Sequence, residues 1–332
     1  MTKNEIRKFL KVPENYRILL QQGGATMQYT AIVKNLIGLK PKKIANLMVT
    51  GMWSNQNYDE MQKHCTVNLV ANTWTDNDCT KCVSYDKWNI HPDASFFYFC
   101  TNETVHGFRF DQDSFPWHMV PKDQVIVGDF SSNIGTEPIR WEKFGVVFAG
   151  AQKNLGPAGC TVIIVREDLL GHAEKDVPVL CDWTLHEKSP DTYYNTPAVF
   201  PMYVTGINVS YMNQMGGIEY YTNLSTQKSQ MLWDCVDQSG GYFKSKITDK
   251  AYRSRVNVIF RIAGGNKELE AKFESEAGKV GIVQIKAHGV NPAIRISMYN
   301  AMPLEGVIYL TKFMRNFQQR NPVAGFEVTA KL

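Results

Sequence analysis

The chain has 332 residues, of which 44% are hydrophobic and 20% are charged, and this balance excludes a disordered or fibrous protein. The formal net charge of +4 is too small an excess to predict binding to nucleic acid or to a membrane surface. No apolar run approaches the roughly 18–20 residues that a membrane span requires. The N-terminal segment is charged and has no signal-peptide core, so we expect a cytoplasmic protein with no membrane or nucleic-acid partner.

Short apolar segments alternate with helical patterns through the first two-thirds of the chain. The expected helices cover residues 26–36 and begin again near Ser54. The expected strands cover residues 16–20, 44–49, 95–99, 124–127, 146–149 and 160–165. Strands that alternate with helices predict a largely parallel sheet covered on both faces.

The pattern changes near residue 240. Before it, residues 201–235 are expected to be helical, with a break at Gly216 and Gly217. After it, we expect strands at residues 256–262, 282–285 and 293–297 and helices at residues 266–280 and 304–318. The sequence thus predicts an α/β protein with a large domain over residues 1–240 and a smaller C-terminal α/β domain over residues 241–332.

The most informative segment lies where an apolar strand runs directly into Gln152, Lys153 and Asn154. A Gly/Pro turn then leads into the next strand, so Lys153 sits in a tight loop between buried elements. A lysine held there is a candidate amine nucleophile, because burial lowers its pKa and frees the lone pair. The alternative is a solvated turn lysine, which is the commoner situation for a lysine.

Asp129 follows another buried strand, at the strand end where open α/β sheets bind their ligands, although it could instead cap a helix. Pyridoxal phosphate needs a lysine for a covalent link and a carboxylate that keeps its pyridine nitrogen protonated, so Lys153 and Asp129 together predict this cofactor. Gly23 and Gly24, between a strand and a helix, suit either an anion or an ordinary tight turn. Trp53 could stack on a flat ring or fill the core.

Seven cysteines are scattered along the chain rather than arranged as a disulfide framework. Cys79 and Cys82 have the spacing of a zinc-binding pair, but a structural zinc site needs a second pair, which the sequence lacks. We therefore expect two reduced thiols in a loop and no metal.

Eight segments carry a resemblance to a known family: VPENYRILLQQGG, VTGMWS, HPDASFFYFCTNETVHG, GDFSSN, FAGAQKNLGPAGCTVIIVREDLLG, YYNTP, RSRVNV and IRISMYNAMPLEGV. Together they resemble the phosphoserine aminotransferases, of the class V group within the type I pyridoxal-phosphate fold. The resemblance runs from about Phe9 to Gln318. It implies that fold, pyridoxal phosphate as cofactor and a homodimer.

The resemblance also implies roles by position. Lys153 would hold the cofactor covalently, Asp129 would pair with its ring nitrogen and Trp53 would stack on its ring. His288 and Arg295 would bind the substrate, and Arg295 would grip the α-carboxylate, a bidentate task that suits guanidinium. The other implied cofactor contacts are Gly24, Ala25, Thr26, Thr104 and Gln152, with Asn195 and Thr196 reaching the phosphate from the partner subunit.

The reaction implied by the resemblance moves the amino group of glutamate to 3-phosphohydroxypyruvate and yields phosphoserine, a step of serine biosynthesis. Two features depart from the family: an N-terminal segment with a His-Arg pair for the substrate phosphate is absent from the sequence, and Gly289 stands where a phosphate-binding arginine is expected. Loss of those contacts costs about 4 kcal/mol or more, roughly a thousandfold in affinity. The alternatives are an impaired paralogue with a binding or regulatory role, and a transaminase for a non-phosphorylated acid.

Overall fold

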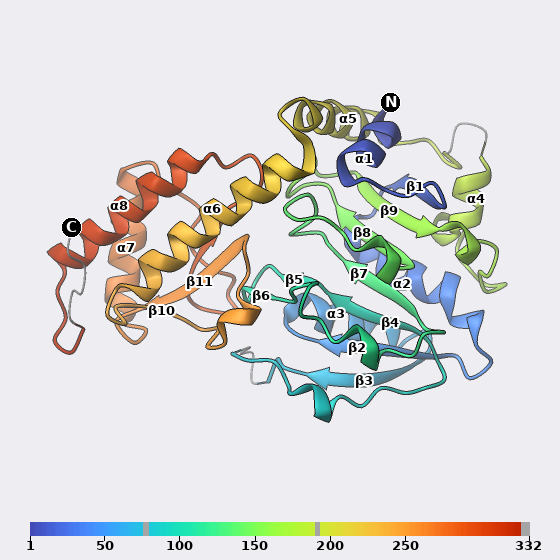
Figure 1. Cartoon of the computed structure of the whole chain (residues 1–332), viewed down its shortest axis with the longest axis horizontal. Coiled ribbons are helices and arrows are strands. Elements are labelled where there is room, and N and C mark those ends of the chain that lie inside the picture. The colour runs from blue at the N-terminus through green and yellow to red at the C-terminus, as the bar shows by residue number, and fades with distance from the viewer. Residues whose placement is uncertain (76–79, 190–192, 327–332) are drawn as a thin grey trace.

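The computed structural model describes residues 1–75, 80–189 and 193–326, and it shows a large lobe and a small lobe (Figure 1). The large lobe is built on a seven-stranded sheet with the order β1-β9-β8-β7-β4-β2-β3. Strands β8, β7, β4, β2 and β3 are mutually parallel, whereas β9 runs antiparallel to both β8 and β1. The strands are β1 (Tyr16–Gln21), β2 (Ile44–Val49), β3 (Thr66–Asn72), β4 (Ala94–Cys100), β7 (Val125–Asp129), β8 (Val146–Gly150) and β9 (Thr161–Arg166). The predicted, largely parallel α/β sheet is confirmed.

Each face of this sheet is buried in its own hydrophobic core, because successive side chains of a strand point to opposite faces. In β4, Phe97 and Phe99 enter one core, while Phe96 and Tyr98 enter the other. The first core is closed by α1, and the second is closed by α2 and α3. The helices of this lobe are α1 (Thr2–Leu10), α2 (Gly24–Leu36), α3 (Met52–Met61), α4 (Trp183–Lys188) and α5 (Val199–Gln214).

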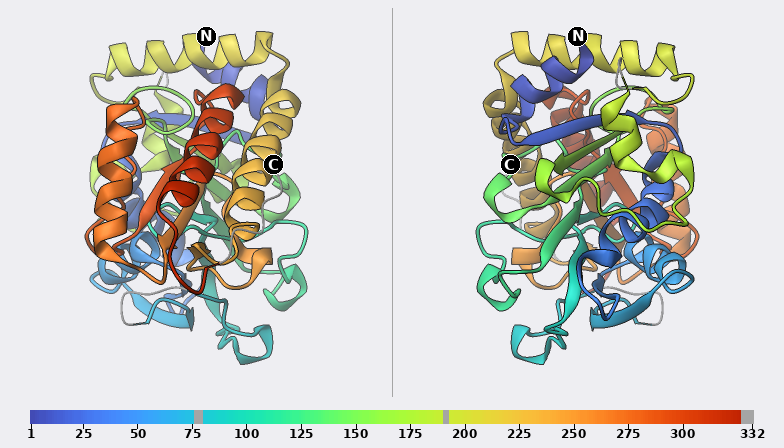
Figure 2. Two further views of the ribbon diagram at one scale, coloured as in Figure 1. Left: turned by 90° about the vertical axis from the view of Figure 1, so that its left-hand side faces the viewer. Right: turned by 90° about the vertical axis from the view of Figure 1, so that its right-hand side faces the viewer.

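The small lobe is an antiparallel sheet with the order β10-β11-β12, covered on its outer face by helices (Figure 2, left). Val258 and Phe260 of β11 and Ile294 and Ile296 of β12 point into this third core. Its elements are α6 (Gly217–Asp237), β10 (Phe243–Ser245), β11 (Asn257–Ile262), α7 (Lys267–Lys279), β12 (Ile294–Ser297) and α8 (Leu304–Arg320). Helix α6 joins the lobes, because its second half belongs to this core.

The predicted strand at residues 282–285 is wrong. This segment is irregular and only Lys286 forms an isolated bridge, to Ile294. Gly281 and Gln284 have φ angles of 82° and 60°, and such left-handed backbone interrupts an extended strand. The sequence analysis also missed β3, an edge strand whose apolar residues are mixed with polar ones, and the two-residue strands β5 (Asn102–Glu103) and β6 (Phe108–Arg109).

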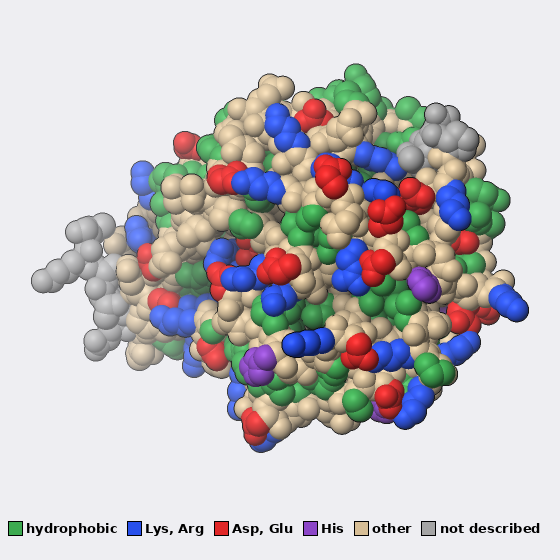
Figure 3. All heavy atoms as spheres, turned by 45° about the vertical axis from the view of Figure 1, so that its right-hand side comes forward, with side chains coloured by type: hydrophobic (Ala, Val, Ile, Leu, Met, Phe, Trp, Pro, Cys, Tyr) green, Lys and Arg blue, Asp and Glu red, His purple; other side chains and the backbone are tan. Residues whose placement is uncertain are grey.

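In the part of the chain that is described, no helix is both long and apolar enough to span a bilayer. On the face seen in Figure 3, basic and acidic side chains are interspersed rather than gathered into one patch.

Candidate active site

The register of the large sheet brings four chain segments to one edge. Gln21 of β1 and Gly150 of β8 both pair with Thr161 of β9, which places their ends two strands apart. Asp129 of β7 pairs with Cys100 of β4 on one side and lies in register with β8 on the other. Because the carboxyl ends of parallel strands share an edge, the segments that follow these strands meet there. The candidate residues after β1, β4, β7 and β8 are therefore neighbours in space.

Lys153 lies in the turn that follows β8. Its Nζ donates a hydrogen bond of 2.6 Å to Thr104 Oγ1 and lies 5.6 Å from the centre of the Trp53 ring. Thr104 belongs to the turn between β5 and β6, and Trp53 belongs to the first turn of α3. The structure thus brings three predicted site residues from three segments into contact around one amine.

The loop of Lys153 is fixed by its neighbour Asn154. The Asn154 side chain donates to the Ser132 carbonyl at 3.0 Å and accepts the backbone N–H of Asn300 at 3.0 Å. Asn300 in turn donates its side-chain amide to the Gly135 carbonyl. The amine is therefore held on a rigid turn, as a reacting group requires.

Asp129 ends β7 with its side chain buried, 4% exposed. Its Oδ1 accepts the backbone N–H of Ser131 at 2.8 Å. Burial raises the pKa of the Asp129 carboxyl above its ordinary value, while the Ser131 hydrogen bonds and the charge of Lys153 oppose that shift. Within the described residues Asp129 has no salt-bridge partner, so a bound cation beside it would favour its ionised form.

The N-terminus of α2 offers backbone N–H groups at the same edge. The residue before the helix is Gly23, whose φ of 87° favours glycine, and no side chain caps this end. A Cβ on Gly23 would lie 2.7 Å from Met27 Cβ, which also excludes larger residues. Because the first N–H groups of a helix have no partner within it, Gly24, Ala25 and Thr26 present an anion site there.

Glu103 is a site residue that the sequence analysis did not single out. Its fully buried carboxylate accepts the backbone N–H groups of Trp53 at 3.2 Å and Ser54 at 2.9 Å, at the N-terminus of α3. Burial raises the pKa of the Glu103 carboxyl, and the Ser54 hydrogen bonds act against this. Glu103 therefore holds the Trp53 backbone next to Thr104, the residue that follows it. The only sequence feature that could have identified Glu103 was its position in the segment ETVHG, directly before Thr104.

Arg295 leaves the small sheet on the face turned toward the large lobe. It is paired with Ile259, and directly paired residues of an antiparallel ladder point to the same face. Ile259 packs against the turn that carries Thr104, because its Cδ1 atom would lie 3.3 Å from a Cβ placed on Gly107 of that turn. Arg295 is half-buried, and its Nε has no hydrogen-bond partner. It is thus available to a ligand between the lobes.

The remaining predicted residues are exposed. His288 is exposed, and its Nδ1 accepts the Val290 N–H of its own loop at 3.4 Å. Gln152 is exposed beside Lys153, where both line a cleft of about 610 Å³. Asn195 and Thr196 are also exposed, and the Thr196 carbonyl accepts the Gln22 side chain of the same chain at 3.1 Å. This hydrogen bond places Thr196 near the start of α2 of its own chain.

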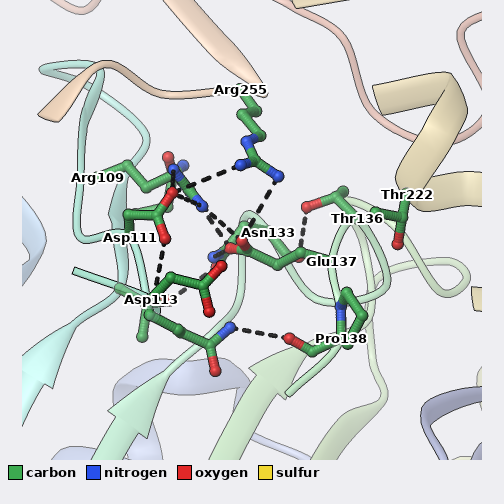
Figure 4. Close-up of polar contacts among 12 residues, drawn as sticks. Arg109, Asp111, Asp113, Asn133, Thr136, Glu137, Pro138, Thr222 and Arg255 are labelled. Atoms are coloured by element: carbon green, nitrogen blue, oxygen red, sulfur yellow. Dashed lines mark hydrogen bonds and ion pairs between the residues drawn. The ribbon is translucent and has the colours of Figure 1, made fainter. Parts of the chain in front are cut away.

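An ion-pair cluster fixes the base of the β5–β6 hairpin (Figure 4). Arg109 is buried and binds Glu137 at 2.5 Å and Asp111 at 3.1 Å. Arg255 reaches the same two carboxylates from the small lobe, at 3.4 Å from Asp111 and 3.9 Å from Glu137. Asn133, four residues after Asp129, donates to Glu137 at 3.0 Å. The cluster thus joins both lobes to the segment behind Asp129.

Only Cys82 of the predicted CxxC pair can be described, because Cys79 lies outside the described residues. Cys82 is a half-buried free thiol, and burial raises its pKa to about 12. Over residues 1–75, 80–189 and 193–326, no three histidine, cysteine or acidic side chains gather as a metal site.

Comparison with known proteins gives a consistent result. The model of the family "Aminotransferase class-V" matches residues 1–310. The chain is 38% identical to "Phosphoserine aminotransferase" of Janthinobacterium sp. (strain Marseille), covering 96% of this chain and 85% of that protein. It is 36% identical to "Phosphoserine aminotransferase 1, chloroplastic" of Arabidopsis thaliana, covering 96% and 71%. A pyridoxal-phosphate-bound phosphoserine aminotransferase from Trichomonas vaginalis superposes with a TM-score of 0.87, at 33% identity over 95% of this chain and 86% of that one.

Proposed function

Because the chain belongs to the class-V aminotransferase family, we propose that it is a pyridoxal-phosphate-dependent transaminase that forms O-phosphoserine from 3-phosphohydroxypyruvate and glutamate. The observation that carries the proposal is the contact of Lys153 with Thr104 and Trp53, on the sheet edge where Asp129 ends the neighbouring strand. An amine and a carboxylate are the groups that this cofactor's chemistry requires of a protein, and an aromatic face can hold its ring.

The chain's own groups fit the cofactor. The uncapped start of α2 offers N–H groups for its phosphate, and Trp53 offers a ring face beside Lys153. Asp129, buried without a salt-bridge partner among the described residues, suits a protonated ring nitrogen. Bound there, pyridoxal phosphate supplies an electron sink that stabilises negative charge at the substrate Cα.

The residues around the amine have separate roles in the proposed reaction. Lys153 would hold the cofactor covalently, and its Nζ, when free, would act as the base for the substrate Cα proton. Thr104 and Trp53 limit where that amine can lie. Arg295 fixes the α-carboxylate of glutamate and of the acceptor, so that the Cα–H bond faces Lys153.

The proposal is tested by two assays on the cofactor-loaded protein. Glutamate alone should bleach the bound cofactor and release 2-oxoglutarate. 3-Phosphohydroxypyruvate should then restore the colour and give phosphoserine. If glutamate has no effect, the proposed function is wrong, and the alternative of an impaired binding or regulatory paralogue is favoured. If only non-phosphorylated 2-oxo acids restore the colour, the alternative of another acceptor is favoured.

Gly289 supplies a prediction about the acceptor. The substitution Gly289→Arg should raise kcat/KM for 3-phosphohydroxypyruvate by about tenfold or more, because one charge-assisted hydrogen bond is worth roughly 1.5–3 kcal/mol. The site can take the side chain, since a Cβ on Gly289 meets no atom within 4 Å and the residue is exposed. Steady-state kinetics with the phosphorylated acceptor measure the gain.

Gly289→Gln is the matched control for this prediction. It adds a shorter polar side chain that can donate a hydrogen bond without the charge, so it should leave kcat/KM near the wild-type value. An equal gain from glutamine, or no gain from arginine, would show that His288 and Gly289 do not face the substrate phosphate.

A homodimer is the second part of the proposal. Helix α5 lies along the outside of the large lobe with α1 beneath it (Figure 2). Its outer face carries a stripe of exposed apolar side chains at helical spacing, namely Val199, Phe200, Tyr203, Ile207 and Tyr211. A continuous exposed stripe of this kind is typical of a protein–protein interface. It begins three residues after Thr196, which supports an interface next to the cofactor phosphate, where the partner subunit's Asn195 and Thr196 are expected to contribute.

Ile207→Glu should therefore convert the dimer to a monomer and weaken cofactor binding, because it places a charge in the middle of the stripe. Size-exclusion chromatography with light scattering measures the mass, and absorbance titration measures the cofactor affinity. The control is Tyr309→Glu, at an exposed apolar residue on α8 of the small lobe, which should remain dimeric. A dimeric Ile207→Glu protein would rule out α5 as the interface.

Two further expectations remain proposals. The division into domains at residue 240 is supported by the separate core of the small lobe, although α6 contributes to that core from residue 232 onward. A cytoplasmic location is also retained as a proposal, which fractionation of cells expressing the full chain would test.

A further inference from the structure

We propose that Asn291 is a positioning residue, which holds the substrate-binding loop of the small lobe against the cofactor-binding turn of the large lobe. The inference rests on the proposed function, since it concerns how glutamate is held over Lys153. Asn291 was not among the residues that the sequence or the family resemblance assigned to the site.

The Asn291 side chain bridges two lobes while buried, 1% exposed. Its Nδ2 donates a hydrogen bond of 2.8 Å to the carbonyl of Val105, the residue next to Thr104. Its Oδ1 accepts from Lys246 Nζ at 2.6 Å, next to β10 in the small lobe. One amide therefore joins the turn that contacts the Lys153 amine to the body of the small lobe.

The loop that carries Asn291 also leads directly into Arg295. Two backbone bonds close this loop into a hairpin, from Ala287 N to Ala293 O at 3.0 Å and from Arg295 N to Ile285 O at 2.8 Å. A turn at the tip joins Asn291 N to the His288 carbonyl at 2.8 Å. Asn291 thus anchors the tip of the hairpin to Val105, while Arg295 lies at its base.

This arrangement sets where the substrate lies. The carboxylate that Arg295 binds and the Cα proton that Lys153 removes belong to one small molecule, so the two side chains must stay a fixed distance apart. A displacement of about 1 Å can cost as much as 100-fold in rate. The hydrogen bond from Asn291 to Val105 holds the turn of the β5–β6 hairpin against the small lobe. The Arg255 ion pairs hold the base of the same hairpin against the small lobe. Together these contacts fix the distance.

The test is Asn291→Asp, which keeps the acceptor for Lys246 but cannot donate to Val105. We expect KM for glutamate to rise about fivefold to tenfold, the scale of one net hydrogen bond. The dissociation constant of glutarate, a dicarboxylate without an amine, should rise by a similar factor in absorbance titrations of the loaded protein. The affinity for pyridoxal phosphate should stay at the wild-type value. Asn291→Ala should behave in the same way and serves if the aspartate variant fails to fold.

Asn321→Asp is the matched control. Asn321 is also buried, its Nδ2 donates to a carbonyl at 2.8 Å and its Oδ1 accepts from a lysine at 2.6 Å, but it lies at the far end of α8. It should match Asn291→Asp in thermal stability and leave KM and glutarate binding unchanged.

The proposal is overturned if the two variants shift KM and glutarate binding equally, or if Asn291→Asp shifts neither. Failure of the proposed function is a separate result, in which the wild-type protein binds pyridoxal phosphate and does not react with glutamate. In that case glutarate binding still decides whether Asn291 positions Arg295.

Discussion

Replacing Lys153 by alanine should abolish transamination, with a loss of at least a thousandfold in kcat. The variant loses both the covalent link to the cofactor and the base that moves the Cα proton, and proton transfer alone is worth about 10²–10⁴-fold. The Lys153 amine is the only one that the structure shows between Thr104 and Trp53 in the described chain. Phosphoserine formation, followed with saturating cofactor, measures the loss.

Two controls separate this effect from a loss of structure. Lys175→Ala changes an exposed lysine and should keep full activity. The thermal midpoint of Lys153→Ala should stay close to the wild-type value without cofactor, because the side chain makes one hydrogen bond. A Lys153→Ala protein that still turns over within tenfold of wild type would show that another group performs the chemistry.

Asp129→Asn should bind the cofactor and lower kcat by about a hundredfold or more. Asparagine can still accept the Ser131 N–H, but it carries no charge to keep the ring nitrogen protonated. Removing one partner of a buried ion pair costs roughly 3–5 kcal/mol, which corresponds to about 10²–10⁴-fold in rate. Single-turnover reaction of the loaded variant with glutamate measures the chemical step without product release.

The control for Asp129 is Asp123→Asn, at an exposed aspartate that pairs with Lys40 at the surface. This variant should react at the wild-type rate, because exposed ion pairs contribute little. An Asp129→Asn protein with an unchanged single-turnover rate would mean that the cofactor ring nitrogen does not lie at Asp129.

Much of the site could be predicted because its residues follow strands. Asp129 ends β7, Lys153 lies in the turn after the adjacent parallel strand β8, and the sequence shows both strands as apolar runs. Parallel strands bring such positions together whatever the details of the loops. Trp53 and Gly24 follow two other strands of the same sheet, and the structure places all four at one edge.

Other parts depend on pairing that a single segment does not reveal. The direction of Arg295 follows from its register with Ile259, and the role of Asn291 follows from a contact with Val105, 186 residues away. An Asn-Pro pair by itself indicates only a turn. Glu103 was missed because an isolated glutamate is usually exposed, whereas here the N-terminus of α3 binds it.

The proposed chemistry requires the cofactor to be attached at Lys153, and one measurement identifies the attachment site. The loaded wild-type protein is reduced with borohydride, digested with trypsin and analysed by mass spectrometry. Attachment at Lys153 blocks cleavage there and predicts a cofactor-bearing peptide over residues 144–166, which glutamate added before reduction should remove. A cofactor mass on a different lysine, or none on any peptide, would contradict the account.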